Sequence, residues 1–484
     1  MRLLVIIMVL FGLEFPSKAQ INTNLGVNSS IAAGFNNIIQ VGVQRSFIGA
    51  GDGNTNAANN SIVGAGYNNG VFSAPRSGIV AGSTNKILTG AVNSFIGSGS
   101  LNTIQSEASN SLIGGGSSNT INTNSCGSVI GGGDSNFVYI YGSNSVIGGG
   151  SANAALNGWS VIGGGRSNAS IGYYSFLGGG RSNTVVGTGA VGCGGGENDV
   201  AGVYAFLGGG QSNVISTIGP YPEFAVLSGG YKNSTDGSLS VISGGFSNLI
   251  TSNGSSAVIS GGAENQALGQ YATVAGGLGS WAGTRSFAAG VRVRATNAGS
   301  FVWSGQDGPS TVSTNDNSFT VRCQGGARFL TTSAQTPAAL VGVRLAGGAT
   351  AWAVLSDSNA KTDFQPIRQR EVLSKVASLP VRAWEYKHDP GRRYLGPTSQ
   401  DFRASFGLGD DTSINTLDAD GVLFASVQGL VQELEERDRA AAWRELQHAS
   451  ALAERDGEIE GLKKDIRELK DRIDSMLPPS TVKK

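Results

Sequence analysis

The sequence is poor in three kinds of residue that ordinary globular domains use freely: cysteine, proline and charged side chains. Its 484 residues include three cysteines, 12 prolines and only 14% charged side chains. An odd number of widely spaced cysteines (Cys126, Cys193 and Cys323) argues against a disulfide framework and predicts that each packs as a small apolar side chain. The low proline content excludes a proline-rich disordered chain.

The charges balance, which excludes two classes of partner. The 34 basic and 34 acidic residues give a formal net charge of zero, so the chain lacks the electrostatic footprint of a protein that binds nucleic acid or an anionic membrane. The charges are also uneven, because the middle of the chain is nearly uncharged and the last quarter is dense in them. The composition predicts no cofactor and no metal.

Glycine is what the chain has in excess. It contributes 75 residues, but these do not fall at every third position, so collagen is excluded. A chain of this length and composition is expected to form several units along an elongated body rather than one compact core.

The first 19 residues have the pattern of a secretory signal peptide. Arg2 precedes an apolar run over residues 3–11, and small residues follow at Ser17 and Ala19. The apolar run is too short to span a bilayer, and no later segment could span one as a helix. We therefore expect cleavage near Ala19 and a protein that is secreted or held at the cell surface.

A repeat of about fifteen residues fills positions 28–300. It reads Ser, two apolar residues, two or three small residues, two variable residues and Asn, as in Ser128-Val129-Ile130-Gly131-Gly132-Gly133 followed by Asn136. A second apolar residue often follows the Asn, as Val138 does here. The spacing between copies is mostly fifteen or seventeen, which places the insertions at one point of the repeat. Other copies begin near Ser46, Ser61, Ser94, Ser111, Ser145, Ser160, Ser175, Ala205, Ala225, Ser240, Ala257, Ala272 and Ser286.

Each repeat is too short for a helical hairpin and reads as short strands with tight turns. The predicted fold class is therefore mostly β, with one repeat forming one coil of a parallel β-roll or β-solenoid. We expect glycine to allow close backbone packing and Asn to occupy left-handed turns. A coil with so few large side chains buries little surface, so the pattern also predicts stacking of coils and association of chains.

Two copies of the repeat carry a family resemblance. Residues 28–34 (Asn-Ser-Ser-Ile-Ala-Ala-Gly) and 286–290 (Ser-Phe-Ala-Ala-Gly) resemble the head repeats of trimeric autotransporter adhesins of the YadA-like type. The resemblance implies a homotrimeric β-roll that displays a binding surface for a host or surface glycan or protein. The glycine triplets and longer spacing differ from that family, and its membrane-anchor barrel is missing.

Three other interpretations of the repeat are weaker. A phosphate-binding loop at Gly97-Ser98-Gly99 would need a strand, a helix and a Lys or acidic partner at fixed positions. A calcium-binding β-roll would need regularly placed Asp residues. A glycosidase on the solenoid would need paired carboxylates across a groove, whereas Asp134, Glu197 and Glu264 are scattered.

Beyond the repeat, residues 301–355 read as a β-rich neck, and the segment after Leu355 carries the second resemblance. Residues 355–361 (Leu-Ser-Asp-Ser-Asn-Ala-Lys) resemble the start of the intramolecular chaperone domain of phage endosialidases and tail fibres, the peptidase S74 family. The likeness continues through 379–386, 395–402 and 418–422 and ends in a coiled coil. Where that family usually carries His, this chain has Tyr394.

The resemblance implies a serine endopeptidase that acts once, in cis or within the trimer. Ser356 would be the nucleophile, Lys361 the base, and the bond between Leu355 and Ser356 would be cut. A lysine can activate a serine hydroxyl when burial keeps the amine neutral. The other motif residues implied are Asp357, Gly396, Pro397, Gln400 and Asp401.

Geometry constrains this pair. Five residues of α-helix turn through about 500°, so Ser356 and Lys361 cannot meet on one regular helix. Either the segment is a loop, or the two side chains meet across subunits of a trimer. The alternative to catalysis is that Ser356 and Asp357 cap a short helix that ends before Pro366, with Lys361 solvated.

The C-terminal residues divide into the chaperone domain (356–425), a helical coiled coil (426–477) and a disordered tail (478–484). Apolar residues recur at three-four spacing from Leu452 to Met476. The sequence thus predicts an exported trimeric fibre whose C-terminal domain aligns the chains and then releases itself. The competing functions are an uncut adhesive or structural fibre that retains this domain and a carbohydrate-active fibre.

Overall fold

The computed structural model describes residues 21–216, 223–305, 308–331 and 342–477. It divides into two compact units, Met1–Gln324 and Gly325–Lys484. The predicted signal peptide (1–19) and the predicted disordered tail (478–484) lie outside the described residues.

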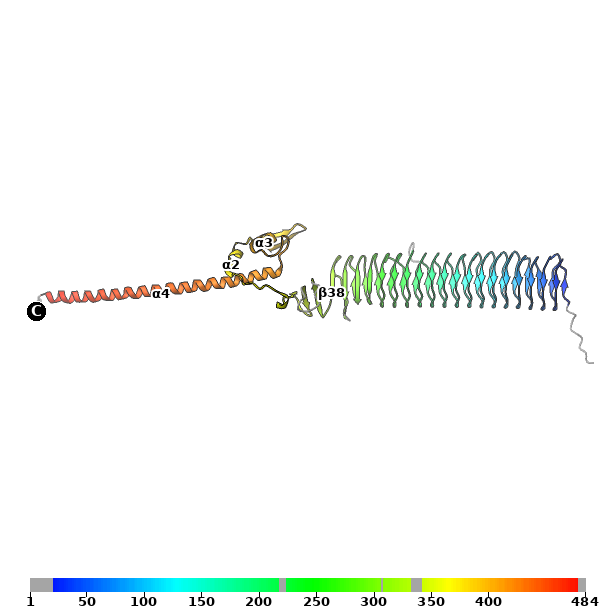
Figure 1. Cartoon of the computed structure of the whole chain (residues 1–484), viewed down its shortest axis with the longest axis horizontal. Helices are drawn as coiled ribbons and strands as arrows, with labels where there is room; N and C mark the ends of the chain where they lie inside the picture. Colours follow the sequence, from blue (N-terminus) through cyan, green and yellow to red (C-terminus); the bar gives the residue numbers. More distant parts are fainter. Residues whose placement is uncertain (1–20, 217–222, 306–307, 332–341, 478–484) are drawn as a thin grey trace, which may run out of the picture. The chain divides into compact units, whose positions relative to one another are not determined.

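The first unit is a parallel β-solenoid, as the repeat predicts, and each coil contributes two short strands. Figure 1 shows these coils stacked in one row. The odd-numbered strands are β1 Thr23–Asn24, β3 Ile38–Ile39, β5 Thr55–Ala57, β7 Gly70–Phe72, β9 Lys86–Ile87, β11 Thr103–Ile104, β13 Thr120–Ile121, β15 Phe137–Val138, β17 Ala154–Ala155, β19 Ala169–Ser170, β21 Thr184–Val185, β23 Asp199–Val200, β25 Val214–Ile215, β27 Ser234–Thr235, β29 Leu249–Ile250, β31 Gln266–Ala267, β33 Trp281–Ala282, β35 Val293–Ala295 and β37 Thr311–Val312. The even-numbered strands are β2 Ser30–Ile31, β4 Phe47–Ile48, β6 Ile62–Val63, β8 Gly78–Ile79, β10 Phe95–Ile96, β12 Leu112–Ile113, β14 Val129–Ile130, β16 Val146–Ile147, β18 Val161–Ile162, β20 Phe176–Leu177, β22 Val191–Gly192, β24 Phe206–Leu207, β26 Val226–Leu227, β28 Val241–Ile242, β30 Val258–Ile259, β32 Thr273–Leu278, β34 Phe287–Val291, β36 Phe301–Ser304 and β38 Phe319–Arg322.

Each strand pairs in parallel with the equivalent strand of the next coil. For example, Val129 and Ile130 of β14 oppose Val146 and Ile147 of β16. The odd-numbered strands form a second sheet in the same way. A third row of single bridges joins the turns after the small residues, as between Asp134 and Ser151. A coil therefore has three hydrogen-bonded sides.

The core lies between the two sheets and is filled by the second residue of each strand. Ile130 of β14 and Val138 of β15 have no exposed surface, and the same holds for their equivalents in most coils. Burying one such side chain contributes about 1.5–3 kcal/mol, so one coil gains only a few kcal/mol from its core. The stability of a coil therefore depends on its neighbours.

The repeat asparagines do not occupy left-handed turns, so that expectation was wrong. They form a buried ladder along the solenoid, and the residue before each of them takes the positive φ, as Ser135 does before Asn136 (φ 55°). The side-chain amide of Asn119 donates to the carbonyls of Gly115 and Gly133, each at 2.9 Å. Its Oδ1 accepts the backbone and side-chain N–H groups of Asn136, each at 3.0 Å. The same amide also donates to Oδ1 of Asn102 in the preceding coil at 3.0 Å, so one asparagine bonds to groups of three coils.

Replacing Asn119 with alanine is expected to destabilise the solenoid by roughly 2–4 kcal/mol, because it leaves several buried backbone and amide groups unpaired. The change should appear as a lower midpoint in chemical denaturation followed by circular dichroism. The matched control is Thr120→Ala, since Thr120 is the next residue and is only half-buried. Equal midpoints for the two variants would contradict a structural role for the ladder.

The solenoid does not stop at residue 300, which corrects the predicted neck (301–355). Phe301–Ser304 of β36 pairs in parallel with Phe319–Arg322 of β38. The rings of Phe287, Phe301 and Phe319 stack with centroids 4.7 and 5.0 Å apart. These last coils lose the glycine triplet and the asparagine but keep the strand register, so the sequence period fades before the fold does.

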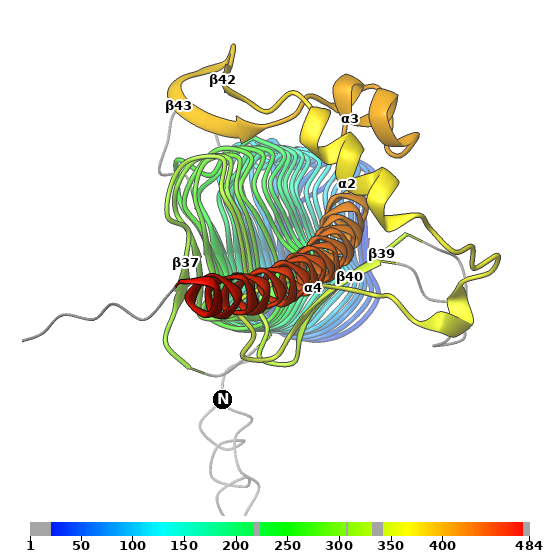
Figure 2. The same cartoon turned by 90° about the vertical axis from the view of Figure 1, so that its left-hand side faces the viewer.

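The second unit is α+β. Three antiparallel strands, β39 Gly326–Leu330, β40 Gly342–Ala346 and β41 Ala353–Val354, lead into a single 3-10 turn, η2 Ser358–Ala360. Helix α2 (Gln369–Ser378) precedes the antiparallel hairpin of β42 (Arg382–Tyr386) and β43 (Asp389–Gly396). Helices α3 (Ser399–Phe406) and α4 (Thr416–Met476) follow, and α2 packs against α4 (Figure 2).

Helix α4 begins at Thr416, ten residues before the predicted boundary at 426, because the side chain of Asn415 caps its N-terminus at the N–H of Leu417 (3.0 Å). The helix is continuous to Met476. Gly429 lies where α2 crosses it, and a Cβ there would press on the carbonyl oxygen of Gln369. The apolar residues at three-four spacing from Leu452 to Met476 are exposed in the single chain.

Two further expectations concern single features. The three cysteines are free. Cys193 is exposed, so the prediction that it packs as a small apolar side chain was wrong, whereas Cys126 and Cys323 are half-buried. Within the described part of the chain, no helix is both long enough and apolar enough to cross a membrane.

Candidate functional site

Ser356 and Lys361 meet in the structure. The amine Nζ of Lys361 lies 2.6 Å from the hydroxyl Oγ of Ser356, within hydrogen-bond distance. Both residues belong to the same chain and to the segment that follows β41. The structure therefore brings the two predicted catalytic side chains together without a second subunit.

The backbone between them explains the contact. Ser358–Ala360 form one 3-10 turn, and Lys361 follows it in an extended conformation (φ −123°, ψ 150°). The carboxylate of Asp357 caps the turn by accepting the N–H of Asn359 at 2.8 Å. Three residues are thus wound into a 3-10 turn between extended residues at Asp357 and Lys361, and this path brings the Lys361 side chain back to Ser356. The capping alternative is correct for Asp357.

The dyad has the geometry for proton transfer but not the enclosure. Ser356, Asp357 and Lys361 are all exposed in the single chain. A lysine accepts a proton only in its neutral form, which a dry environment favours and water does not. The peptide bond between Leu355 and Ser356 is also accessible, since Leu355 is only half-buried. The N–H of Leu355 donates to the carbonyl of Gly342 at 3.0 Å.

The other predicted motif residues belong to the hairpin and α3 rather than to the dyad. Gly396 ends β43, and Pro397 precedes Thr398, whose hydroxyl caps α3 at the N–H of Asp401 (3.1 Å). The carboxylate of Asp401 pairs with Arg382 at 3.2 Å. These residues join the helix to the hairpin, so their contacts are structural.

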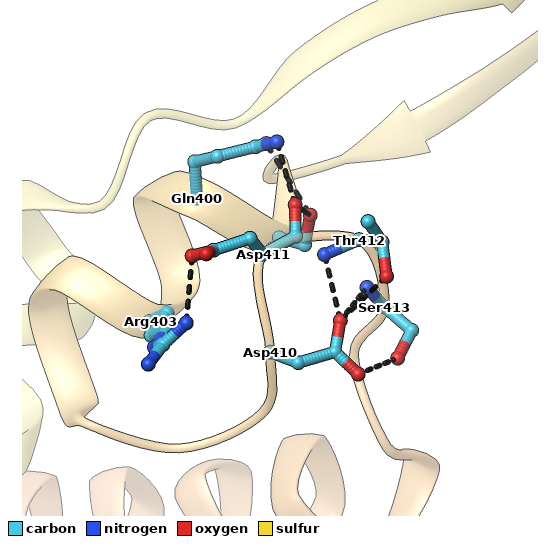
Figure 3. Close-up of polar contacts among 7 residues, drawn as sticks. Gln400, Arg403, Asp410, Asp411, Thr412 and Ser413 are labelled. Carbon is cyan, nitrogen blue, oxygen red and sulfur yellow. Dashed lines mark hydrogen bonds and ion pairs between the residues drawn. The ribbon is translucent and has the colours of Figure 1, made fainter.

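Gln400 contacts a loop that the sequence reasoning missed (Figure 3). Its side-chain amide donates to the carbonyl of Asp411 at 2.7 Å, and the carboxylate of Asp411 pairs with Arg403 at 2.7 Å. Asp410 accepts four hydrogen bonds, from the N–H and hydroxyl groups of Thr412 and Ser413, at 2.6–2.7 Å. Residues 410–413 (Asp-Asp-Thr-Ser) follow Gly407 and Gly409, and this composition is typical of a tight turn. The sequence could therefore have indicated the loop.

These hydrogen bonds set the charge of Asp410. They stabilise its carboxylate and hold its pKa well below the ordinary value, with the Ser413 hydroxyl as the largest cause and the groups of Thr412 next. A lowered folded-state pKa contributes stability that is present above the unfolded-state value, about pH 4, and is lost as the pH falls further. The loop between α3 and α4 is therefore expected to weaken in acid.

Replacing Asp410 with asparagine should lower the melting temperature of the C-terminal unit slightly at pH 7 and flatten its loss below about pH 4. The effect is small because the carboxylate is exposed. Helical circular dichroism of the full chain on heating at pH 7 and pH 3 measures it, with Asp420→Asn on α4 as the control. If Asp410→Asn loses as much melting temperature between pH 7 and pH 3 as the wild-type chain does, the proposed stabilising role of the Asp410 carboxylate is contradicted.

Tyr394 fills the place where the S74 resemblance expects His. It lies on β43, and its ring stacks on that of Trp384 with centroids 5.0 Å apart. The substituted residue therefore packs within the hairpin.

One of the acidic residues considered for a glycosidase on the solenoid has a partner: Glu197 is ion-paired with Arg181 at 2.9 Å.

The chain combines a parallel β-solenoid with an α+β unit that contains a long helix. Residues 356–407 of that unit match the family described as chaperone of endosialidase, peptidase S74. The matched segment begins at the serine of the dyad and ends directly after α3. No curated protein matches the chain.

Proposed function

We propose that the chain is an exported fibre protein whose C-terminal domain aligns identical chains, three by analogy with trimeric fibres, and then cuts itself free before Ser356. The observation that carries the proposal is the 2.6 Å contact between Lys361 Nζ and Ser356 Oγ at the first residues of the matched segment. The hydrophobic pattern of residues 1–19 supports export to the cell surface or the medium.

The reaction is an acyl shift followed by hydrolysis. Lys361, in its neutral form, takes the proton of the Ser356 hydroxyl, and Oγ attacks the carbonyl carbon of Leu355. The C–N bond between Leu355 and Ser356 breaks, and the nitrogen takes a proton and becomes the free α-amine. Water then hydrolyses the Leu355 ester, which gives the Leu355 carboxylate and restores the Ser356 hydroxyl.

Enclosure of the dyad would couple this reaction to assembly. Because Ser356 and Lys361 are exposed in one chain, neighbouring chains would have to exclude water from them before the amine becomes an effective base. Cleavage would then follow assembly and would remove the aligning domain from a fibre that is kinetically trapped. The exposed apolar residues of α4 fit a coiled coil between chains.

The same exposure favours one alternative, a fibre that retains the domain uncut. Intact mass and N-terminal sequencing of the purified protein distinguish the two functions. A fragment that begins at Ser356 supports self-cleavage. A full-length chain that is assembled by light scattering overturns self-cleavage and leaves an assembly domain. A host or surface glycan or protein remains the proposed ligand of the fibre.

A further inference from the structure

The outer face of the even-numbered strands carries an unusual row of side chains. The second residue of each strand points into the core, so the first residue faces outward. These outward residues are apolar in nearly every coil, and several are large and exposed, as Phe95, Phe176 (42% exposed) and Phe206 are. The row consists of Phe47, Ile62, Gly78, Phe95, Leu112, Val129, Val146, Val161, Phe176, Val191, Phe206, Val226, Val241, Val258, Thr273, Phe287, Phe301 and Phe319, after Ser30 in β2.

The other sheet provides an internal comparison. Its outward positions have the same geometry but are mixed in character. Threonine recurs in several coils, Lys86 and Asp199 are charged, and other positions, such as Phe137 and Leu249, are apolar. No residue of the even-numbered row is charged. Since both rows occupy equivalent sites on short parallel strands, strand propensity does not explain why the even-numbered row is apolar in nearly every coil while the odd-numbered row is mixed. The difference points to a face that is covered in the working protein.

The size of the row supports the same conclusion. Eight side chains of the row, from Phe47 to Phe319, are 36–67% exposed, and most of the others are half-buried. Together they expose on the order of 1,000 Å² of apolar surface. The largest apolar patch on a monomeric protein is typically about 300–600 Å², and a stable interface takes about 800 Å² from each partner. The row is therefore large enough for a stable interface.

The spacing of the row along the solenoid indicates which kind of partner could cover it. Each coil contributes one outward residue, and successive strands in a sheet lie about 4.8 Å apart. A partner that packs against every coil must have the same spacing over the same length, and another copy of this solenoid has it.

We propose that the outer face of the even-numbered strands is the contact surface between parallel, in-register copies of this chain. The inference deepens the proposed assembly of identical chains but rests on the solenoid alone. When like faces meet around a common axis, each outward residue lies nearest to its own copies. The odd-numbered face is then left in solvent for other partners.

Single cysteines test the proposal in the full chain with Cys126, Cys193 and Cys323 changed to serine. Val146→Cys lies on the proposed face, and Ala154→Cys, in the same coil, lies on the odd-numbered face; Leu112→Cys and Thr120→Cys form a second pair. Under mild oxidation, covalent dimers between copies should form at least tenfold faster at positions 146 and 112. The variants are first compared with the parent chain by circular dichroism.

Equal or faster crosslinking at positions 154 and 120 would overturn the proposal, and so would a chain that is monomeric by light scattering. The pairs are also made in the Ser356→Ala background, which keeps the C-terminal domain attached. If the face preference is present in both backgrounds while wild type is never cut, the contact surface stands and self-cleavage fails. If wild type is cut and crosslinking shows no preference for either face, self-cleavage stands and the proposed contact surface fails.

Discussion

Ser356→Ala is expected to keep the purified protein at full length, whereas the wild-type chain should yield a fragment that begins at Ser356. Alanine has no hydroxyl to attack the Leu355 carbonyl, so the acyl shift cannot begin. Lys361→Ala should slow the reaction by on the order of 100-fold or more, since it removes the base that lies 2.6 Å from Oγ. Intact mass spectrometry over time measures both rates.

Two further variants separate the chemistry from the local fold. Lys361→Arg keeps a positive charge near Ser356 but lacks a usable neutral form, so it should also fail to cut. Ser358→Ala removes a neighbouring hydroxyl from the 3-10 turn and keeps the backbone bond from the N–H of Lys361 to the carbonyl of Ser358 (3.1 Å). It should cleave like wild type. Cleavage of Ser356→Ala at the same bond would refute the assigned nucleophile.

Gly133→Ala should destabilise the solenoid severely, whereas Gly132→Ala, one residue earlier, should have little effect. Gly133 has a φ of 94°, and a Cβ there would overlap the carbonyl oxygen of Gly150 in the next coil. The left-handed conformation and the forced backbone shift together cost roughly 2–4 kcal/mol. A Cβ on Gly132 would find its nearest neighbour, the carbonyl oxygen of Gly115, at 3.9 Å.

Chemical denaturation followed by circular dichroism compares the two variants in the full chain. Because each coil contacts only its neighbours, Gly133→Ala is expected to split the unfolding transition or expose the adjoining coils to protease. Equal stability of the two variants would mean that the coils stack less closely than the structure shows.

Much of the fold could be predicted because the same local sequence pattern recurs in every copy of the repeat. Two apolar residues flanked by Ser and Gly predict a short strand, and the spacing of the copies predicts insertions at one point of the repeat. The structure places that point between the odd-numbered strand and the next Ser. The coils at Phe301 and Phe319 were not predicted, since they keep the strand register after the glycine triplet and asparagine are gone. Parallel pairing depends on the neighbouring coil, which a local pattern does not describe.

The residues of the candidate site could be predicted from the sequence, but their contacts could not. Residues 355–361 stand out in the sequence, but whether Ser356 and Lys361 touch depends on dihedral angles that residue types alone do not set. The loop around Asp410 was missed because its hydrogen bonds are made only when the chain between α3 and α4 closes on itself.

The sequence by itself determined the period of the solenoid, its two strands per coil and the candidate dyad, because each depends on residues that are close together along the chain. The tertiary structure alone decided which residue of each apolar pair faces the core, where α4 begins and what the repeat asparagines do. Asn119 shows the physical reason: its hydrogen bonds reach Asn102 and Asn136, one coil to each side, and such contacts exist only once the coils are stacked.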